Sequence, residues 1–275
     1  MSQAAKAALI ADLKSRIASP LSIGGDGCAA MSLGDAKIDR MLPDGGLRLG
    51  ALHEIVAATY HDTGAVGGFL AGLAVCVMSR STAPILWCDA GRSPFDMGRL
   101  YGPGIAAFGL DPARLILVAP PRDSDCLWVM EEALRSHAFA AVVGEVESSS
   151  ASLDLTATRR LQLAAEEAKI PVFLSTGCRK AAGGASAAVT RWQVKAAPSA
   201  PVSYADEKER LPGIPRWEVD LVRSRGGQPG HWLVEWSGAA NLFSVIDAEE
   251  THRAKPGLVA GYANVEALVP LRRMG

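Results

Sequence analysis

A glycine-rich segment, HDTGAVGGFLAGLAVCV at residues 61–77, has the position of a phosphate-binding loop but lacks the side chains that would do its chemistry. A working loop reads G-x-x-x-x-G-K-[ST], in which backbone N–H groups surround the phosphates, the lysine neutralises them and the hydroxyl holds Mg²⁺. Here Gly68 is followed by Phe69 and Leu70, and Thr63 stands where the first glycine belongs. An aromatic and an aliphatic side chain supply neither charge nor metal ligand. We therefore expect a phosphate loop by position alone, with Phe69 part of the core.

This segment lies within an alternation of apolar strands and helices. It follows a short apolar strand, LHEIVAA, and the glycine-rich turn is expected to lead into a helix over 65–80. Further strands are predicted from four apolar runs, at residues 83–90, 113–120, 139–147 and 171–177. Helices are predicted between these runs, over 94–110, 125–138 and 156–170. Strands that alternate with helices need crossover connections, so the pattern predicts an α/β fold with a mostly parallel sheet flanked by helices.

The C-terminal third has a different pattern, in which polar and apolar residues alternate. Two runs, AAVTRWQVKA and RWEVDLVRSRGGQPGHWLVEW, predict antiparallel strands that extend the sheet, with a turn at RGGQPG. Residues 241–275 then form an extension with too few flanking elements to build a core alone. The chain is expected to divide into an N-terminal helix and linker over 1–31, a core domain over 32–240 and this extension over 241–275.

The extension carries apolar side chains that either fold back on the sheet or wait for a protein partner. We favour the partner, because a segment beyond a complete sheet is not needed to close it. Together with the first helix, the extension is expected to bind a partner through apolar anchors. These anchors include Leu242, Phe243, Val245 and Ile246.

The composition and charge limit the classes of protein to which the chain can belong. The 275 residues are 49% hydrophobic and 21% charged, which indicates a large globular domain with a sizeable core. A formal net charge of -1 provides no overall positive field for tight non-specific binding of nucleic acid. The five cysteines lack C-x-x-C spacing, so we expect no zinc site and a reducing, cytoplasmic environment. The longest apolar run, about residues 65–78, falls short of the roughly 20 residues that span a bilayer, and we expect no membrane segment.

Several segments, in order, resemble one family. The run SLGDAKIDRMLPDGGLRLGALHEI at 32–55 resembles the start of the core of RecA recombinases. Three later runs, RLYGPGIAAFGLDPARLILV, LWVMEEALRSHAFAAVVGEV and LDLTATRRLQLAAEEAKIPVFLS, resemble the ImuA family of RecA-like proteins from bacterial inducible-mutagenesis operons. The resemblance covers about residues 32–236 and implies a RecA-like fold.

The resemblance also implies what has been lost. RecA-like ATPases carry Lys and Ser/Thr at the positions of Phe69 and Leu70. Where they have Asp-Ala-Glu, this chain ends the same motif in Gly91, so the carboxylate that positions the attacking water is missing. Glu145, at the end of an apolar strand, matches the Walker B acid and is expected to be vestigial. We expect no ATPase activity, no cofactor and no bound metal. The degenerate loop comprises Gly67, Gly68, Phe69 and Leu70.

Two groups of basic residues could contact DNA. The run STGCRKAAGGASAAVT occupies the place of the loop with which RecA contacts single-stranded DNA, and it contains Arg179 and Lys180. Two cations are common in exposed loops and no aromatic side chain there could stack on a base, so any binding is expected to be weak and salt-dependent. The second group, Arg216, Arg223 and Arg225, lies among tryptophans; there the favoured interpretation is a solvated arginine face opposite a buried tryptophan face.

By the same resemblance, the chain would act in SOS-induced mutagenic translesion DNA synthesis through protein partners. The partners implied are an ImuB-like protein related to polymerases and an error-prone C-family DNA polymerase, with RecA and a second copy of this chain as further candidates. Two other functions stay open. One is a DNA-repair ATPase that binds ATP in an unusual way, through Glu145 and a basic residue from elsewhere. The other is a SulA-like inhibitor of cell division, against which the length of the chain argues.

Overall fold

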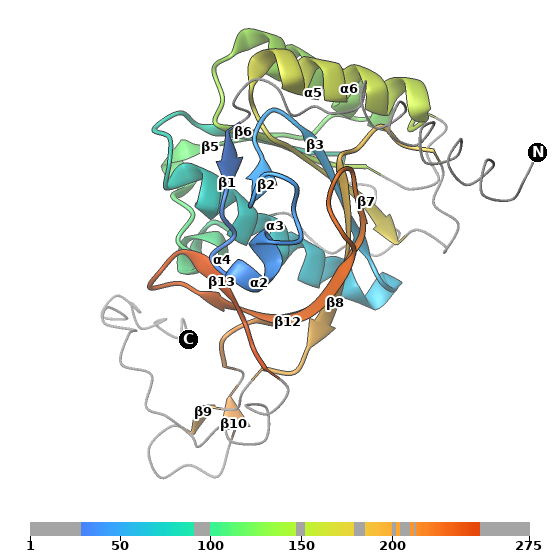
Figure 1. The fold of residues 1–275 in the computed structure, drawn as a ribbon. Helices are drawn as coiled ribbons and strands as arrows, with labels where there is room; N and C mark the ends of the chain where they lie inside the picture. Colours follow the sequence, from blue (N-terminus) through green and yellow to red (C-terminus); the bar gives the residue numbers. More distant parts are fainter. Residues whose placement is uncertain are drawn as a thin grey trace, which may run out of the picture.

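The chain forms one nine-stranded sheet with helices on both faces (Figure 1). The computed structural model describes residues 29–90, 100–146, 152–178, 185–199, 202–203, 210–211 and 213–247. The strands lie in the order β13-β12-β11-β8-β3-β7-β6-β4-β5. Their bounds are β3 Leu52–Ala57, β4 Ile85–Asp89, β5 Leu115–Val118, β6 Ala141–Glu145, β7 Val172–Cys178, β8 Thr190–Ala197, β11 Arg216–Ser224, β12 Gly230–Ser237 and β13 Leu242–Val245.

The sheet is parallel in one part and antiparallel in the other. Strands β3, β7, β6, β4 and β5 run parallel to their neighbours, and β11, β12 and β13 are antiparallel. Strand β8, expected among the antiparallel strands, lies parallel to β3 on one side and antiparallel to β11 on the other. The central strand β3 is buried along its whole length, as expected for a strand covered on both faces. The α/β class, the mostly parallel sheet and the antiparallel C-terminal strands are thus confirmed.

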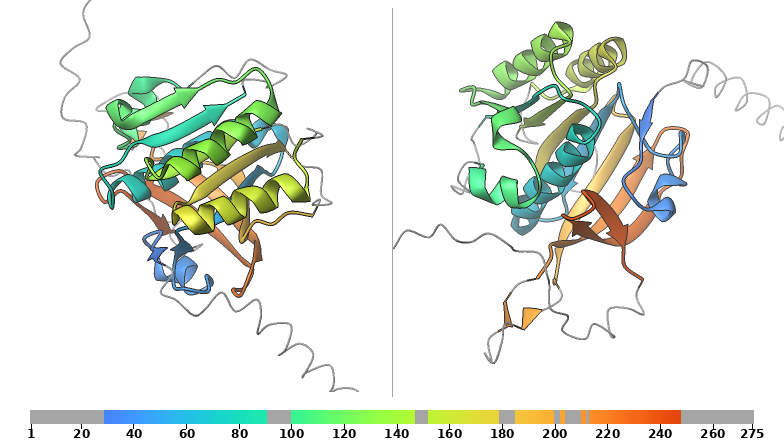
Figure 2. Two further views of the ribbon diagram at one scale, coloured as in Figure 1. Left: turned by 90° about the horizontal axis from the view of Figure 1, so that it is seen from above. Right: turned by 90° about the vertical axis from the view of Figure 1, so that its left-hand side faces the viewer.

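The helices divide between the two faces of the sheet. Helix α3 (Thr63–Met78) shares one core with α2 (Ala36–Asp39) and α4 (Gly102–Ala107), while α5 (Asp123–Ser136) and α6 (Leu155–Ala168) share a core on the opposite face (Figure 2). A helix broken at Gly-Pro was expected over 94–110, of which residues 94–99 lie outside the described part of the chain. In the remainder, Pro103 lies in the first turn of α4, where its missing N–H costs nothing. The remaining elements are β1 Ala30–Met31, β2 Leu47–Arg48, η1 Tyr60–Asp62, η2 Pro112–Arg114, β9 Val202–Ser203 and β10 Arg210–Leu211.

Helix α3 is the most apolar helix of the described part of the chain. Together with η1 it gives a 19-residue stretch, Tyr60–Met78, that by length and composition alone could cross a membrane. In this fold 67% of that stretch is buried between the sheet and its surroundings, which is typical of the core helix of a globular protein. The apolar residues of α3 are therefore accounted for by packing against protein.

An aromatic cluster joins α3 to the antiparallel strands. The ring of Phe69 lies 4.9 Å from that of Phe243 and 6.0 Å from that of Trp217, and the rings of Trp236 and Phe243 are also 4.9 Å apart. Trp192 of β8 lies at 6.5 Å from Phe69. These separations are those of interacting aromatic pairs, so the cluster contributes area burial and specific ring contacts to stability.

Strand β13 corrects the expectation that residues beyond 240 lie outside the sheet. Phe243 is only 2% exposed, and its backbone N–H donates to the carbonyl of Leu33 at 2.9 Å. The N–H of Val245 donates to Asp35 Oδ2 at 3.0 Å, and that of Ile246 to the carbonyl of Leu233 at 2.8 Å. Phe243 is therefore a core residue and not a free anchor, since the sheet was not complete at β12. The predicted N-terminal helix and residues 248–275 lie outside the described part of the chain.

The alternation along β13 gives a matched pair of variants. Phe243→Ala is expected to lower the free energy of unfolding by about 3 to 5 kcal/mol, because a large buried ring leaves a cavity among the other aromatic rings. Leu242→Ala, at a side chain that is 36% exposed, is expected to cost about 1 kcal/mol or less. Urea denaturation of both variants measures the difference; equal and small losses would show that β13 contributes little to the fold.

Candidate functional site

The position of the phosphate loop is occupied by helix. Helix α3 begins at Thr63, so the residues expected to form a glycine-rich turn are its first two turns. From Gly67 onward the backbone N–H groups lie within the helical hydrogen-bonding pattern and cannot surround a phosphate. Phe69 is 3% exposed and Leu70 is fully buried, and both lie in the core as expected for Phe69. The expectation of a turn is therefore corrected, because these residues form the first two turns of α3.

The glycines of α3 have a packing role that the motif did not suggest. A Cβ atom at Gly72 would lie 2.6 Å from Phe243 Cζ and 3.1 Å from two atoms of the Trp236 indole. At Gly68 it would lie 3.3 Å from the Trp217 indole. At Gly67 a Cβ atom would meet nothing within 4 Å. Gly72 and Gly68 thus let the aromatic cluster approach the helix axis.

Two carboxylates lie side by side where β4 and β6 end. Asp89 and Glu145 are register partners in neighbouring parallel strands, which places their backbones roughly 4.8 Å apart. The Trp87 indole Nε1–H donates to Glu145 Oε1 at 2.6 Å. Burial raises the pKa of Glu145 to about 7, and the charge of Asp89 acts in the same direction while the Trp87 hydrogen bond opposes it.

A hollow of about 660 Å³ lies between these carboxylates, α3 and α4. Its volume is within the range of ligand sites in proteins. Among its described lining residues the basic side chain is Arg216, whose Nε donates to Glu235 at 2.6 Å. The sequence predicted Glu145 and the glycines here but not the aromatic wall, which comes from Tyr101, Phe108 and Trp217 on two separate segments.

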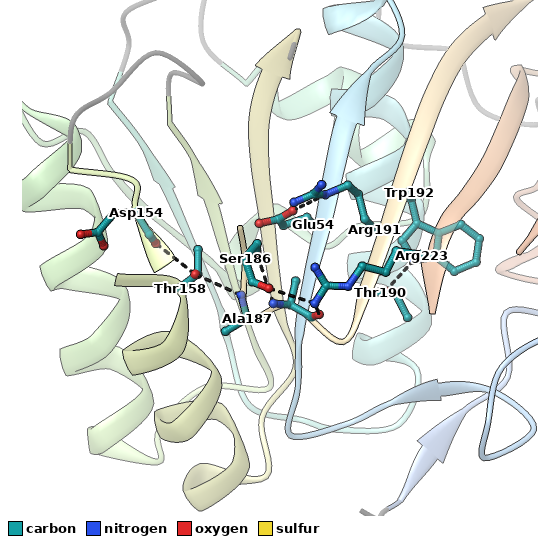
Figure 3. Close-up of polar contacts among 10 residues, drawn as sticks. Glu54, Asp154, Thr158, Ser186, Ala187, Thr190, Arg191, Trp192 and Arg223 are labelled. Atoms are coloured by element: carbon teal, nitrogen blue, oxygen red, sulfur yellow. Dashed lines mark hydrogen bonds and ion pairs between the residues drawn. The ribbon is translucent and has the colours of Figure 1, made fainter. Parts of the chain in front are cut away.

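The predicted DNA-binding residues are not brought together by the described part of the chain. Arg179 and Lys180 lie outside it. Farther along the chain, residues 186–188 are held by Arg223, whose Nη2 donates to the carbonyls of Ser186 at 2.9 Å and Ala188 at 3.0 Å (Figure 3). The N–H of Ala187 donates to Thr158 Oγ1 at 3.2 Å, which ties this segment to α6.

Two arginines of the second basic group make contacts within the sheet and with the segment before it. Arg216 pairs with Glu235 across β11 and β12, and Arg223 holds the backbone before β8. Arg191 of β8 pairs with the buried Glu54 of β3, with 2.6 Å between Nε and Oε2 (Figure 3). The tryptophans of β11 and β12 are buried on the opposite face, as the alternating pattern predicted. In the described residues, no group of three or more His, Cys, Asp or Glu side chains could hold a metal ion.

The raised pKa of Glu145 predicts a pH-dependent stability. Between the unfolded value of about 4.5 and the folded value of about 7, the folded chain holds a proton that the unfolded chain has lost. The contribution of Glu145 to the free energy of unfolding therefore falls as pH rises through this window. Glu145→Gln keeps the acceptor for Trp87 and is expected to be more stable than wild type by about 1 to 3 kcal/mol near pH 8, with a smaller gain near pH 5. Urea denaturation at both pH values tests this; an equal effect at both would contradict it.

Comparison with known proteins identifies the family. No family model matches the chain. The protein named ImuA from two strains of Caulobacter vibrioides is 35% identical to it over 215 residues, which are 74% of this chain and 82% of the relative. The match therefore extends over most of both chains, well beyond the glycine-rich segment. The chain belongs to the ImuA family.

Proposed function

We propose that this chain is an accessory protein of damage-induced mutagenic DNA synthesis that neither binds nor hydrolyses ATP to useful extent and acts through protein partners. Membership of the ImuA family supports the theme of damage-induced mutagenesis. The observation that carries the non-catalytic part is the start of α3 at Thr63, which puts helix where a phosphate cradle would be. Phe69 and Leu70 stand where RecA-like ATPases have the Lys and Ser/Thr that bind the nucleotide, and both are buried in the core.

The charge of the site also disfavours nucleotide. A triphosphate brings several negative charges, and catalysis of phosphoryl transfer depends on cations that neutralise them. The hollow beside α3 presents Asp89 and Glu145 instead, and the guanidinium of Arg216 is engaged by Glu235. When ionised, these two carboxylates would repel the negatively charged phosphates of a nucleotide in the hollow. An ATPase with an unusual site has the volume of the hollow in its favour, but the acidic lining argues against it.

Exposed apolar side chains support a role in protein contact. Trp128 on α5 is 59% exposed, while each of the other five tryptophans is at most 9% exposed. Ile116 and Leu117 on the edge strand β5 are 45% and 54% exposed. Exposed apolar groups of this kind are typical of binding surfaces. We propose as partners an ImuB-like protein, an error-prone C-family polymerase, RecA or a second copy of this chain, in the cytoplasm and with at most weak contact to single-stranded DNA.

Calorimetric titration of the full chain with Mg·ATP tests the non-catalytic part. We expect no saturable heat at ligand concentrations up to about 1 mM, because the described residues of the site offer Arg216 only as the partner of Glu235, and helix at the place of the phosphate loop. A dissociation constant in the low micromolar range would contradict the proposal.

Deletion of the gene in its own host tests the mutagenic part. The frequency of mutations after ultraviolet damage is expected to fall, with the spontaneous frequency unchanged, and complementation with the wild-type chain is expected to restore it. An unchanged frequency after damage would contradict the proposed role.

A further inference from the structure

The hollow beside α3 has the chemistry of a site for a cation on an apolar stem. Asp89 and Glu145 line it, together with residues of α4, of the first turns of α3 and of the start of β11. Gly67 also lines the hollow, and nothing lies within 4 Å of the position that a Cβ atom would take there. A ligand can therefore reach the carboxylates along an apolar surface.

Glu145 is the group best placed to receive such a cation. Its Oε1 accepts the Trp87 indole N–H, and this hydrogen bond fixes the carboxylate in one orientation. The residue also lines the hollow. A partly buried carboxylate beside a second carboxylate gains from a cation that supplies both charge and hydrogen-bond donors.

The walls suit the rest of the ligand. Tyr101 is 70% exposed, and Phe108 and Trp217 present further aromatic surface to the hollow. Aromatic rings attract ammonium and guanidinium groups and also pack against methylene chains. Ala71 and Ile105 extend the apolar lining. A neutral apolar ligand would leave Glu145 without its counter-charge, and a metal ion would find too few ligands among the described residues.

We propose that this hollow binds the side chain of a lysine or arginine presented by a partner protein, with Glu145 receiving the cationic head and the aromatic walls receiving the stem. The proposal rests on the proposed function, in that the ligand is taken to come from a protein partner. The hollow lies beside the segment that binds nucleotide in RecA-like ATPases, and the proposed ligand is positively charged whereas a nucleotide is negatively charged.

The test uses Nα-acetyl-lysine methylamide as the probe and the indole N–H signals of the ¹⁵N-labelled full chain as the readout, near pH 8. Trp87 reports on Glu145, and Trp217, whose Nε1–H donates to the Ala65 carbonyl at 2.9 Å, reports on the wall. Trp128, exposed on α5, is the internal control. Nα-acetyl-norleucine methylamide has the same stem without the charge and serves as the neutral probe.

We expect saturable shifts of the Trp87 and Trp217 signals with a dissociation constant in the millimolar range, and an unmoved Trp128 signal. Glu145→Gln should weaken binding roughly tenfold, the effect of losing a hydrogen bond to a charged group. Glu218→Gln, on the outer face of β11, should leave it unchanged. The proposal is overturned if the signals stay still, if norleucine shifts them equally, or if Glu145→Gln binds as wild type does. Any of these results would overturn the lysine or arginine site alone. The proposed function is tested separately, by the ATP titration and by the mutation frequencies, so the two failures are distinguishable.

Discussion

Helix α3 packs against the aromatic face of β11, β12 and β13 at a separation that only glycine allows at position 72. The rings of Phe243 and Trp236 occupy the space that a side chain there would need. This contact brings α3 close to β12 and β13, and β13 itself pairs with β12 at the edge of the sheet. Because Phe69 points from the same helix into the same cluster, the core on this face depends on one close approach.

The consequence for function follows from the same packing. A phosphate loop needs a lysine and a hydroxyl that leave the core for the ligand, whereas here both positions turn inward among aromatic rings. Among its described lining residues, the hollow beside the helix presents two carboxylates and the guanidinium of Arg216, which is paired with Glu235. Burial raises the pKa of Glu145 to about 7, and acids with perturbed pKa values are frequent at binding sites. The site is thus changed in charge but retains a cavity.

Local patterns in the sequence predicted eight of the nine strands of the large sheet, all but β13, and the longer helices, because apolar runs and alternation are read directly from neighbouring residues. They failed where a contact comes from a distant segment. The glycines of α3 resemble a turn until Trp236 and Phe243, more than 160 positions later, are placed against them. Phe243 likewise resembled a free anchor, since nothing in its own segment indicates that β12 has an open edge. The hollow needed the same knowledge, because its walls come from segments that are far apart in the chain.

The unfolding free energies of two alanine variants distinguish helix packing from phosphate binding as the role of the α3 glycines. Gly72→Ala is expected to destabilise the chain by about 1 to 3 kcal/mol, because the added methyl group overlaps the Phe243 ring. Gly67→Ala meets no neighbour and is expected to stabilise by up to about 1 kcal/mol, through the higher helix propensity of alanine. Opposite signs support the account. A destabilising Gly67→Ala together with a neutral Gly72→Ala would contradict it, since that result would indicate a strained loop at 63–68 and no tight helix packing at 72.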